Sequence, residues 1–385
     1  MALVNLPFRR HLIACIVGSL SFTVSAAFAQ ENDAPSNFKF SGFFSAVAGK
    51  TFNGDIPANY SGSSSINGTV CPCYTADWSN AGVYNNSFSL APESRVGLQA
   101  GYTINKDFSL TGQVVVRGSD TTPNVQWAYA SYKLDNAWEV QFGRKRIPLY
   151  FYSDFEDIGV SYPWVSPPPE LYGWEATNYN GASIRYRTSF GDNNLSVSGF
   201  LGKEKLNDSL YEKLSYAGQT SVTWNNILGA DAELDRGPLT IRGVYVQADV
   251  HVTNNSIALD STAKLKAYGI AINVDLDDWF LLSELTQLSR SFESAGYKIT
   301  APAYTIGAGY RLGAWTPFIN YASYREKSTD LSQYQPQSYK RASMTVRYDI
   351  DAKSAVKVQL DRNQDVTNNY GGNVNVFRIA YDRLF

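Results

Sequence analysis

The chain has 385 residues, of which 33 are lysine or arginine and 35 are aspartate or glutamate, and a formal charge of −2 does not favour nucleic-acid binding. Three cysteines are too few for a disulfide scaffold, so a larger fold must supply the stability. No apolar run after residue 28 is long enough to cross a bilayer as a helix, although alternating strands that cross a membrane escape this test.

Residues 1–29 have the pattern of an export signal. A basic pair, Arg9 and Arg10, precedes the apolar run 12–28, which ends in the small-x-small pattern that a signal peptidase cuts before Gln30. A membrane anchor is the less favoured interpretation, because the run is shorter than the ~20 residues of a spanning helix. Cleavage would leave a mature chain, 30–385, with 31 basic and 35 acidic residues and a formal charge of −4.

Beyond the signal, polar and apolar residues alternate in sixteen segments. A period of two is that of a β-strand with one apolar and one wet face. The predicted strands span residues 38–49, 93–104, 107–118, 124–134, 137–146, 180–190, 193–202, 219–234, 239–252, 263–275, 279–290, 299–312, 314–326, 339–350, 354–363 and 374–385. Most have ~10 to 12 residues, the length that a tilted strand needs to cross hydrocarbon.

Short and long connections alternate between these strands. The short ones are 105–106, 135–136, 191–192, 235–238, 277–278, 313 and 351–353, and the long ones include 50–92, 147–179, 203–218, 253–262, 327–338 and 364–373. Short turns at one end and long loops at the other are typical of a membrane β-barrel. Hydrocarbon offers backbone groups no partner, so the first and last strands must pair. We therefore predict an all-β fold, a transmembrane antiparallel barrel of 16 strands around an aqueous channel.

Arginine recurs on the wet faces of the predicted strands. In 95–104, Val96, Leu98 and Ala100 share the apolar face, which leaves Arg95 on the other. An arginine that faced lipid at the midplane would cost about 2–4 kcal/mol, so the register is well specified. The predicted basic pore wall consists of Arg95, Arg117, Arg144, Lys145, Arg146, Arg185, Arg187, Arg311, Arg341 and Arg347. Any one of them could instead pair with a nearby acid and only solvate the wall.

The segment 147–179 is rich in aromatic and acidic residues. So many aromatic side chains on a free surface loop would form an exposed apolar patch, so they should pack against something. The candidate constriction residues are Tyr150, Tyr152, Asp154, Glu156, Asp157, Trp164, Glu170, Tyr172 and Glu175. Opposed to basic wall residues, these acids could set a transverse field; alternatively, they only anchor the loop.

Two further features bear on chemistry. Cys71-Pro72-Cys73 lies in the long first loop, and a disulfide is favoured over free thiols or a metal site, since no further cysteine or histidine is at hand. His251 is the single histidine left after cleavage, so a hydrolase that uses histidine beside serine or an acid is disfavoured. We expect no enzyme, no metal and no cofactor.

The chain resembles the Gram-negative outer-membrane porins. The resemblance is carried by the signal, the first strand from Phe38, the second strand with Arg95, the inserted loop and the final Phe385. Arg383 is a departure from the usual terminal pattern. The stretches 143–149, 162–164 and 167–170 look like the phosphate-selective and dicarboxylate-type group. The resemblance to porins implies a third loop folded into the pore and a homotrimer in the outer membrane of a Gram-negative bacterium. It also implies that the barrel assembly machinery inserts the chain into the lipid through its C-terminal strand.

Three functions follow as hypotheses. The first is a water-filled channel for passive diffusion of small hydrophilic solutes or ions, with a lean to anions because the wall is arginine-rich. The second is a substrate-specific channel with a site for a sugar or organic acid at the neck, where the slide would be formed by Tyr150, Tyr152, Trp164 or Tyr172. The third is a secreted soluble all-β binding protein.

Overall fold

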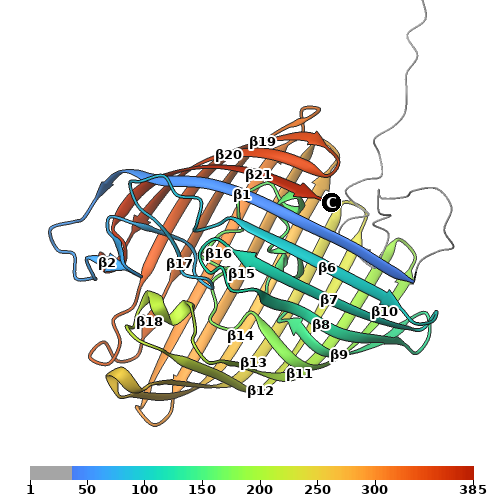
Figure 1. Ribbon diagram of the computed structural model, residues 1–385, viewed down its shortest axis with the longest axis horizontal. Coiled ribbons are helices and arrows are strands. Elements are labelled where there is room, and N and C mark those ends of the chain that lie inside the picture. The colour runs from blue at the N-terminus through green and yellow to red at the C-terminus, as the bar shows by residue number, and fades with distance from the viewer. Residues whose placement is uncertain (1–36) are drawn as a thin grey trace, which may run out of the picture.

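The computed structural model describes residues 37–385, which form one closed antiparallel β-barrel (Figure 1). The predicted signal peptide lies outside the described residues. The sixteen barrel strands are β1 (Phe38–Asp55), β6 (Arg95–Thr103), β7 (Phe108–Arg117), β8 (Asn124–Lys133), β9 (Trp138–Arg146), β10 (Asn178–Phe190), β11 (Asn193–Leu206), β12 (Ser221–Arg236), β13 (Leu239–Asn254), β14 (Leu259–Leu276), β15 (Trp279–Phe292), β16 (Tyr297–Tyr310), β17 (Trp315–Arg325) with its continuation β18 (Lys327–Ser328), β19 (Ser338–Asp351), β20 (Ser354–Asp365) and β21 (Asn373–Leu384). The predicted fold class is confirmed.

The barrel closes where β1 meets β21, and the two strands lie side by side in Figure 1. Ala46 faces Tyr381 across this seam, and the backbone N–H of Phe385 donates to the carbonyl of Gly42 at 3.0 Å. On its other edge β1 pairs with β6 only as far as Ser45. Above that point the first loop takes over, and the N–H of Gly49 donates to a carbonyl there at 3.0 Å.

The two faces of the wall differ as the alternation predicts. Inward side chains such as Gln113, Thr345 and Gln359 are polar and buried. The outward face carries apolar side chains that are 41–62% exposed, namely Leu98, Leu110, Ile270, Leu285, Ile306, Ile319 and Met344. Around the end with the short turns, aromatic rings pair on this face at 4.6–4.7 Å, Trp138 with Tyr186, Trp279 with Tyr310 and Trp315 with Tyr348. Aromatic girdles of this kind mark the level of a membrane interface.

The connections sort to the two ends of the barrel, as predicted. At the turn end, Gly191 and Gly237 adopt positive φ values of 56°, which glycine tolerates without strain. At the loop end, the first loop (56–94) contains the short strands β2 (Ser65–Ile66), β3 (Thr69–Val70), β4 (Tyr74–Asp77) and β5 (Gly82–Tyr84). The third loop (147–177) contains the 3-10 turns η1 (Ser153–Phe155) and η2 (Gly159–Ser161). The fourth loop (207–220) contains η3 (Tyr211–Leu214), and the fifth (255–258) contains η4 (Asn255–Ile257). The fifth loop is shorter than predicted because β13 and β14 extend further. Within residues 37–385, none of the helices could span a membrane.

The wall is not equally tall all round. Strands β6 to β9 have 9 or 10 residues each, whereas β12 to β16 have 14 to 18. The second loop (118–123), between β7 and β8, is correspondingly short. The low side of the barrel is therefore β6–β9.

Candidate functional site: a constricted lumen

The third loop, residues 147–177, leaves β9, runs through the interior of the barrel and returns to β10. Wall side chains on distant strands hold its backbone there. Arg242 of β13 donates to the carbonyl of Pro148 at 2.7 Å, and Lys357 of β20 donates to that of Trp164 at 2.6 Å. The expectation that this segment folds into the barrel is confirmed.

Asp157 is the carboxylate around which three wall arginines gather. Arg117 donates to its two oxygens at 2.6 and 2.7 Å, Arg146 also binds it, and Arg95 donates to its main-chain carbonyl at 2.9 Å. Arg146 pairs with Glu156 as well, at 2.8 Å. Burial acts to raise the pKa of the Asp157 carboxyl, but the guanidinium charges outweigh it and hold the pKa well below its ordinary value. Asp157 therefore stays charged and ties the loop to β6, β7 and β9.

A second anchor is a chain of five buried charges. Glu170 of the third loop pairs with Arg341 at 2.9 Å, and Arg341 reaches Asp361 at 2.8 Å. Asp361 pairs with Arg378 at 2.8 Å, and Arg378 with Glu93, at the end of the first loop, at 2.7 Å. None of the five residues is more than 4% exposed. Because a buried charge is costly without a partner, these five linked charges fix the third loop against β19, β20 and β21.

Sequence reasoning missed most of the partners on the last two strands. Lys357 is fully buried and pairs with Asp382 at 3.0 Å. Asp382 also accepts a hydrogen bond from Ser45 at 2.6 Å. The available signal was the alternation itself, which places Lys357 and Asp361 on one face of β20, and Arg378 and Asp382 on one face of β21.

The loop aromatics fasten the loop to the wall. Trp164 packs edge-on against Phe318 with ring centroids 5.2 Å apart, and Tyr172 lies 4.5 Å from Tyr150. Tyr172 also donates to the Glu284 carboxylate at 2.7 Å. Trp164, Tyr172 and Tyr150 are at most 7% exposed, so these three rings present little surface to a passing solute. Of the four rings expected to form a slide, Tyr152 alone is half-buried.

Three half-buried basic residues, Lys145 on β9 and Arg185 and Arg187 on β10, line the wall from the level of the third loop toward the turn end, and we call them the neck face. Lys145 donates to Ser183 at 3.2 Å, and Arg187 lies 3.6 Å from Glu139. In the part of the chain that the structure describes, half-buried Arg185 makes no hydrogen bond or ion pair. The charges of Arg185 and of three acids, Asp154 on the third loop and Glu139 and Asp231 on the wall, all act on Lys145. An acidic loop residue therefore lies near a basic wall, which is the arrangement that a transverse field requires.

The other predicted charged site residues form ion pairs, and Arg347 also donates to the third-loop carbonyls of Val160 and Tyr162 at 2.8 and 3.0 Å. In these ion pairs, Arg144 lies 2.7 Å from Glu204, Arg311 lies 2.7 Å from Asp275, and Arg347 lies 2.7 Å from Asp349, each distance between a guanidinium nitrogen and a carboxylate oxygen. Glu175 lies 2.6 Å from Arg290. Arg311 lies at the turn end, where it stacks on Phe280, a ring that packs in one cluster with Trp164 of the third loop. In the first loop, Cys71 and Cys73 are joined in a disulfide. The acids thus anchor the loop at most positions, and within the neck face Arg185 is the residue that has neither a hydrogen bond nor an ion pair to residues 37–385.

Comparison with known proteins places this fold among outer-membrane barrels. No protein-family model matches the sequence, and no curated protein matches it either. The structure is similar to the outer-membrane channel DcaP of Acinetobacter baumannii (TM-score 0.60, 11% identity, 90% of this chain and 97% of that chain). It is also similar to the anion-selective porin from Comamonas acidovorans (0.56, 14%, 90% and 99%) and to OmpF of Salmonella typhi (0.55, 15%, 90% and 97%). At these identities the likeness extends to the fold: the chain has the architecture of the outer-membrane porins.

Proposed function

We propose that this chain is an exported outer-membrane porin. After loss of residues 1–29 it forms a water-filled channel for passive diffusion of small hydrophilic solutes, with a preference for anions and no enzymatic activity. The observation that carries this proposal is a closed barrel with an apolar outer belt and a charged interior that one inserted loop narrows.

The preference for anions rests on the neck face. Arg187 pairs there with Glu139, whereas Arg185, between Lys145 and Arg187, is paired with no carboxylate of residues 37–385. Low-dielectric walls focus the field of such charges on a narrow passage.

The apolar outer belt disfavours the soluble binding protein, because exposed patches of that extent need a covering of lipid or protein.

Planar-bilayer recording tests the proposal. Protein purified in detergent from the outer-membrane fraction, with Gln30 as its expected first residue, should insert in steps of conductance that rise with KCl concentration. Under a KCl gradient the reversal potential should have the sign of anion preference. Material that stays monodisperse without detergent, or that gives no steps, would refute the channel; a reversal potential of the opposite sign would refute only the preference.

A substrate-specific channel for an organic acid is the second candidate. The observation that favours it is Arg185, a half-buried cation without a bonded partner beside Lys145. A dicarboxylate that bound there would block the ion current at millimolar concentration. The expected block disappears in Arg185→Gln, while a neutral sugar of similar size leaves the current unchanged in both proteins.

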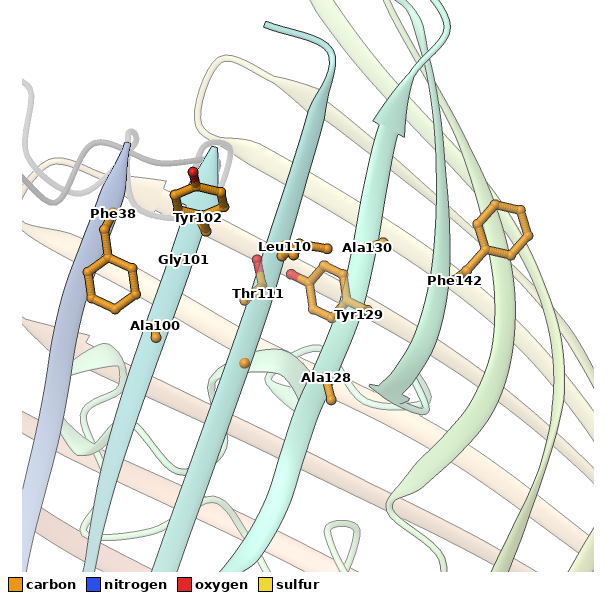
Figure 2. Close-up of a pocket in the computed structure, with 11 residues that line it drawn as sticks. Phe38, Ala100, Gly101, Tyr102, Leu110, Thr111, Ala128, Tyr129, Ala130 and Phe142 are labelled. Atoms are coloured by element: carbon orange, nitrogen blue, oxygen red, sulfur yellow. The ribbon is translucent and has the colours of Figure 1, made fainter. Parts of the chain in front are cut away.

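We also infer that the chain assembles as a homotrimer through its low wall, β6–β9. A groove of about 480 Å³ crosses the outer face of this wall near the turn end. Figure 2 shows Phe38 and Tyr102 on one side of the groove, with Ala100 beside Tyr102 on β6, Phe142 on the other side, and Ala128 and Ala130 between them. Small residues flanked by large rings let a second copy approach closely. A trimer form is described for OmpT of Vibrio cholerae, whose structure is similar (TM-score 0.56, 12% identity, 90% of this chain and 99% of that chain).

Filling the groove should break the trimer. Ala128→Trp places a large side chain between the flanking rings, so mass photometry in mild detergent is expected to show monomers, where the wild type shows trimers. The control Ile319→Trp adds similar bulk to an outward site on β17 that is 62% exposed, and it should remain trimeric. A monomeric wild type, or a trimeric Ala128→Trp variant, would contradict the proposed interface.

A further inference from the structure

The first loop lies over the mouth of the barrel and forms an apolar cluster with other loops there. This mouth cluster comprises Ile66, Cys73, Trp78 and Ala81 of the first loop, Leu210, Tyr211 and Leu214 of the fourth, Tyr339 of β19 and Tyr370 of the eighth loop (366–372). Trp78 is at its centre and is 7% exposed. Its ring stacks on Tyr370 at 4.7 Å and on Tyr339 at 5.6 Å, and it lies 6.1 Å from Tyr211.

These contacts bridge opposite sides of the mouth. The fourth loop joins β11 to β12, and the eighth joins β20 to β21. Eight of the sixteen strands lie between these two loops whichever way round the barrel is followed. Trp78 therefore joins two loops that arise from opposite sides of the barrel and meet over its mouth, above the third loop. Below it, the N–H of Trp174 in the third loop donates to Ser79 at 3.3 Å.

The two edges of the first loop are held differently. On the eighth-loop side, polar bonds fasten it: the N–H of Cys73 donates to the carbonyl of Gly371 at 2.9 Å, and Thr75 is hydrogen-bonded to Tyr370 at 3.0 Å. On the fourth-loop side, no hydrogen bond or ion pair joins the two loops within residues 37–385, and the contact is made by apolar groups. This edge is held by apolar packing and by the bond from Trp174 to Ser79, so it is the easier one to part.

We propose that the first loop is a lid, hinged on the eighth loop, that closes the mouth when Trp78 packs against Tyr211 and Leu214 of the fourth loop. Beside the closed lid a cavity of about 120 Å³ remains, lined on the lid by Ser79 and Asn80. Its other walls include Arg117, Arg144, Arg146, Glu204 and Asp208. Lifting the free edge widens this polar passage to the neck, so the lid controls access to the channel.

This inference rests on the proposed channel function, and its first test uses the channel as the readout. Tyr211→Ala removes the fourth-loop ring that faces Trp78, and loss of one aromatic pair should raise the open-to-closed ratio roughly two- to tenfold. Single-channel records should show longer open times, and liposomes should swell faster with sugars. The control Tyr216→Ala lies in the same loop and outside the mouth cluster, and it is 38% exposed. It should behave as the wild type.

A reversible lock gives the second test. A Cβ added at Gly173 of the third loop would lie 2.9 Å from the Cβ of Trp78. The two Cβ atoms of a disulfide are about 3.8 Å apart, so cysteines at these positions could form a disulfide once the loops separate by about 1 Å. We expect Trp78→Cys with Gly173→Cys, in a Cys71→Ser and Cys73→Ser background, to be closed when oxidised and open after reduction.

The outcomes separate the lid from the channel. A wild type without conductance refutes the channel itself. If the wild type conducts and its open time equals that of Tyr211→Ala, the lid is refuted. The lid is also refuted if reduction leaves the conductance of the double-cysteine variant unchanged, or if its disulfide does not form. Faster sugar swelling in Tyr211→Ala, together with reduction-dependent opening of the locked variant, supports it.

Discussion

Replacing Asp157 by asparagine is expected to make the channel strongly anion-selective and to widen its neck. Asp157 compensates Arg95, Arg117 and Arg146 in the same place, and the asparagine amide leaves their positive charge facing the lumen. Because a narrow low-dielectric passage concentrates the field, the ratio of anion to cation permeability should rise roughly tenfold. The reversal potential in a KCl gradient measures this ratio. Faster liposome swelling with neutral sugars would show that the loop has also moved.

Acid should not reproduce this effect within the ordinary pH range. A carboxylate whose folded pKa is lowered stabilises the fold above its unfolded pKa, near 3.9, and loses that contribution only as the pH falls through the lowered value. Asp157 should therefore keep its charge from pH 8 to pH 5. Burial raises the pKa of the neighbouring Glu156 to about 7, so a change of the reversal potential in this range would come from Glu156 and not from Asp157. The matched control is Asp192→Asn, an exposed aspartate in a tight turn at the other end of the barrel. If Asp157→Asn gives the reversal potential of that control, the constriction lies elsewhere.

The barrel could be predicted from the sequence because one period controls it. Alternation along 95–104 placed Arg95 inward and Val96 outward, as the structure has them, and the same test holds for Arg341 and Arg347 on β19. Strand ends were less accurate: β1 continues to Asp55 because loop residues replace β6 as its partner. Above the apolar belt the two faces of a strand no longer need different side chains, so the alternation does not indicate where the strand ends.

The partners inside the barrel could not be predicted in the same way. Arg378 pairs with Glu93 across a sequence separation of 285, and Thr75 bonds to Tyr370 across 295. Such pairs depend on closure, which brings the first and last strands together, and no local pattern encodes it. The third loop shows the same limit, since its aromatic composition indicated packing but did not reveal that Trp164 meets Phe318.

Replacing Lys357 by methionine should cause the largest loss of stability. The ammonium group is fully buried, and it holds the Asp382 carboxylate at 3.0 Å and the carbonyl of Trp164 at 2.6 Å. Methionine matches the length of the side chain but leaves a buried carboxylate without its countercharge, which costs about 3–5 kcal/mol. The midpoint of urea unfolding, followed by tryptophan fluorescence in detergent, should fall accordingly.

Two variants show whether the lost pair is the cause. Lys106→Met changes an exposed lysine in a turn and should shift the stability by less than about 0.5 kcal/mol. Asp382→Asn added to Lys357→Met removes the stranded charge, so the double variant should be more stable than Lys357→Met alone. If Lys357→Met unfolds at the wild-type midpoint, the ion pair is not what fastens the third loop to β20 and β21. The anchoring would then rest on the Glu170–Arg341 chain and on the aromatic contacts of Trp164.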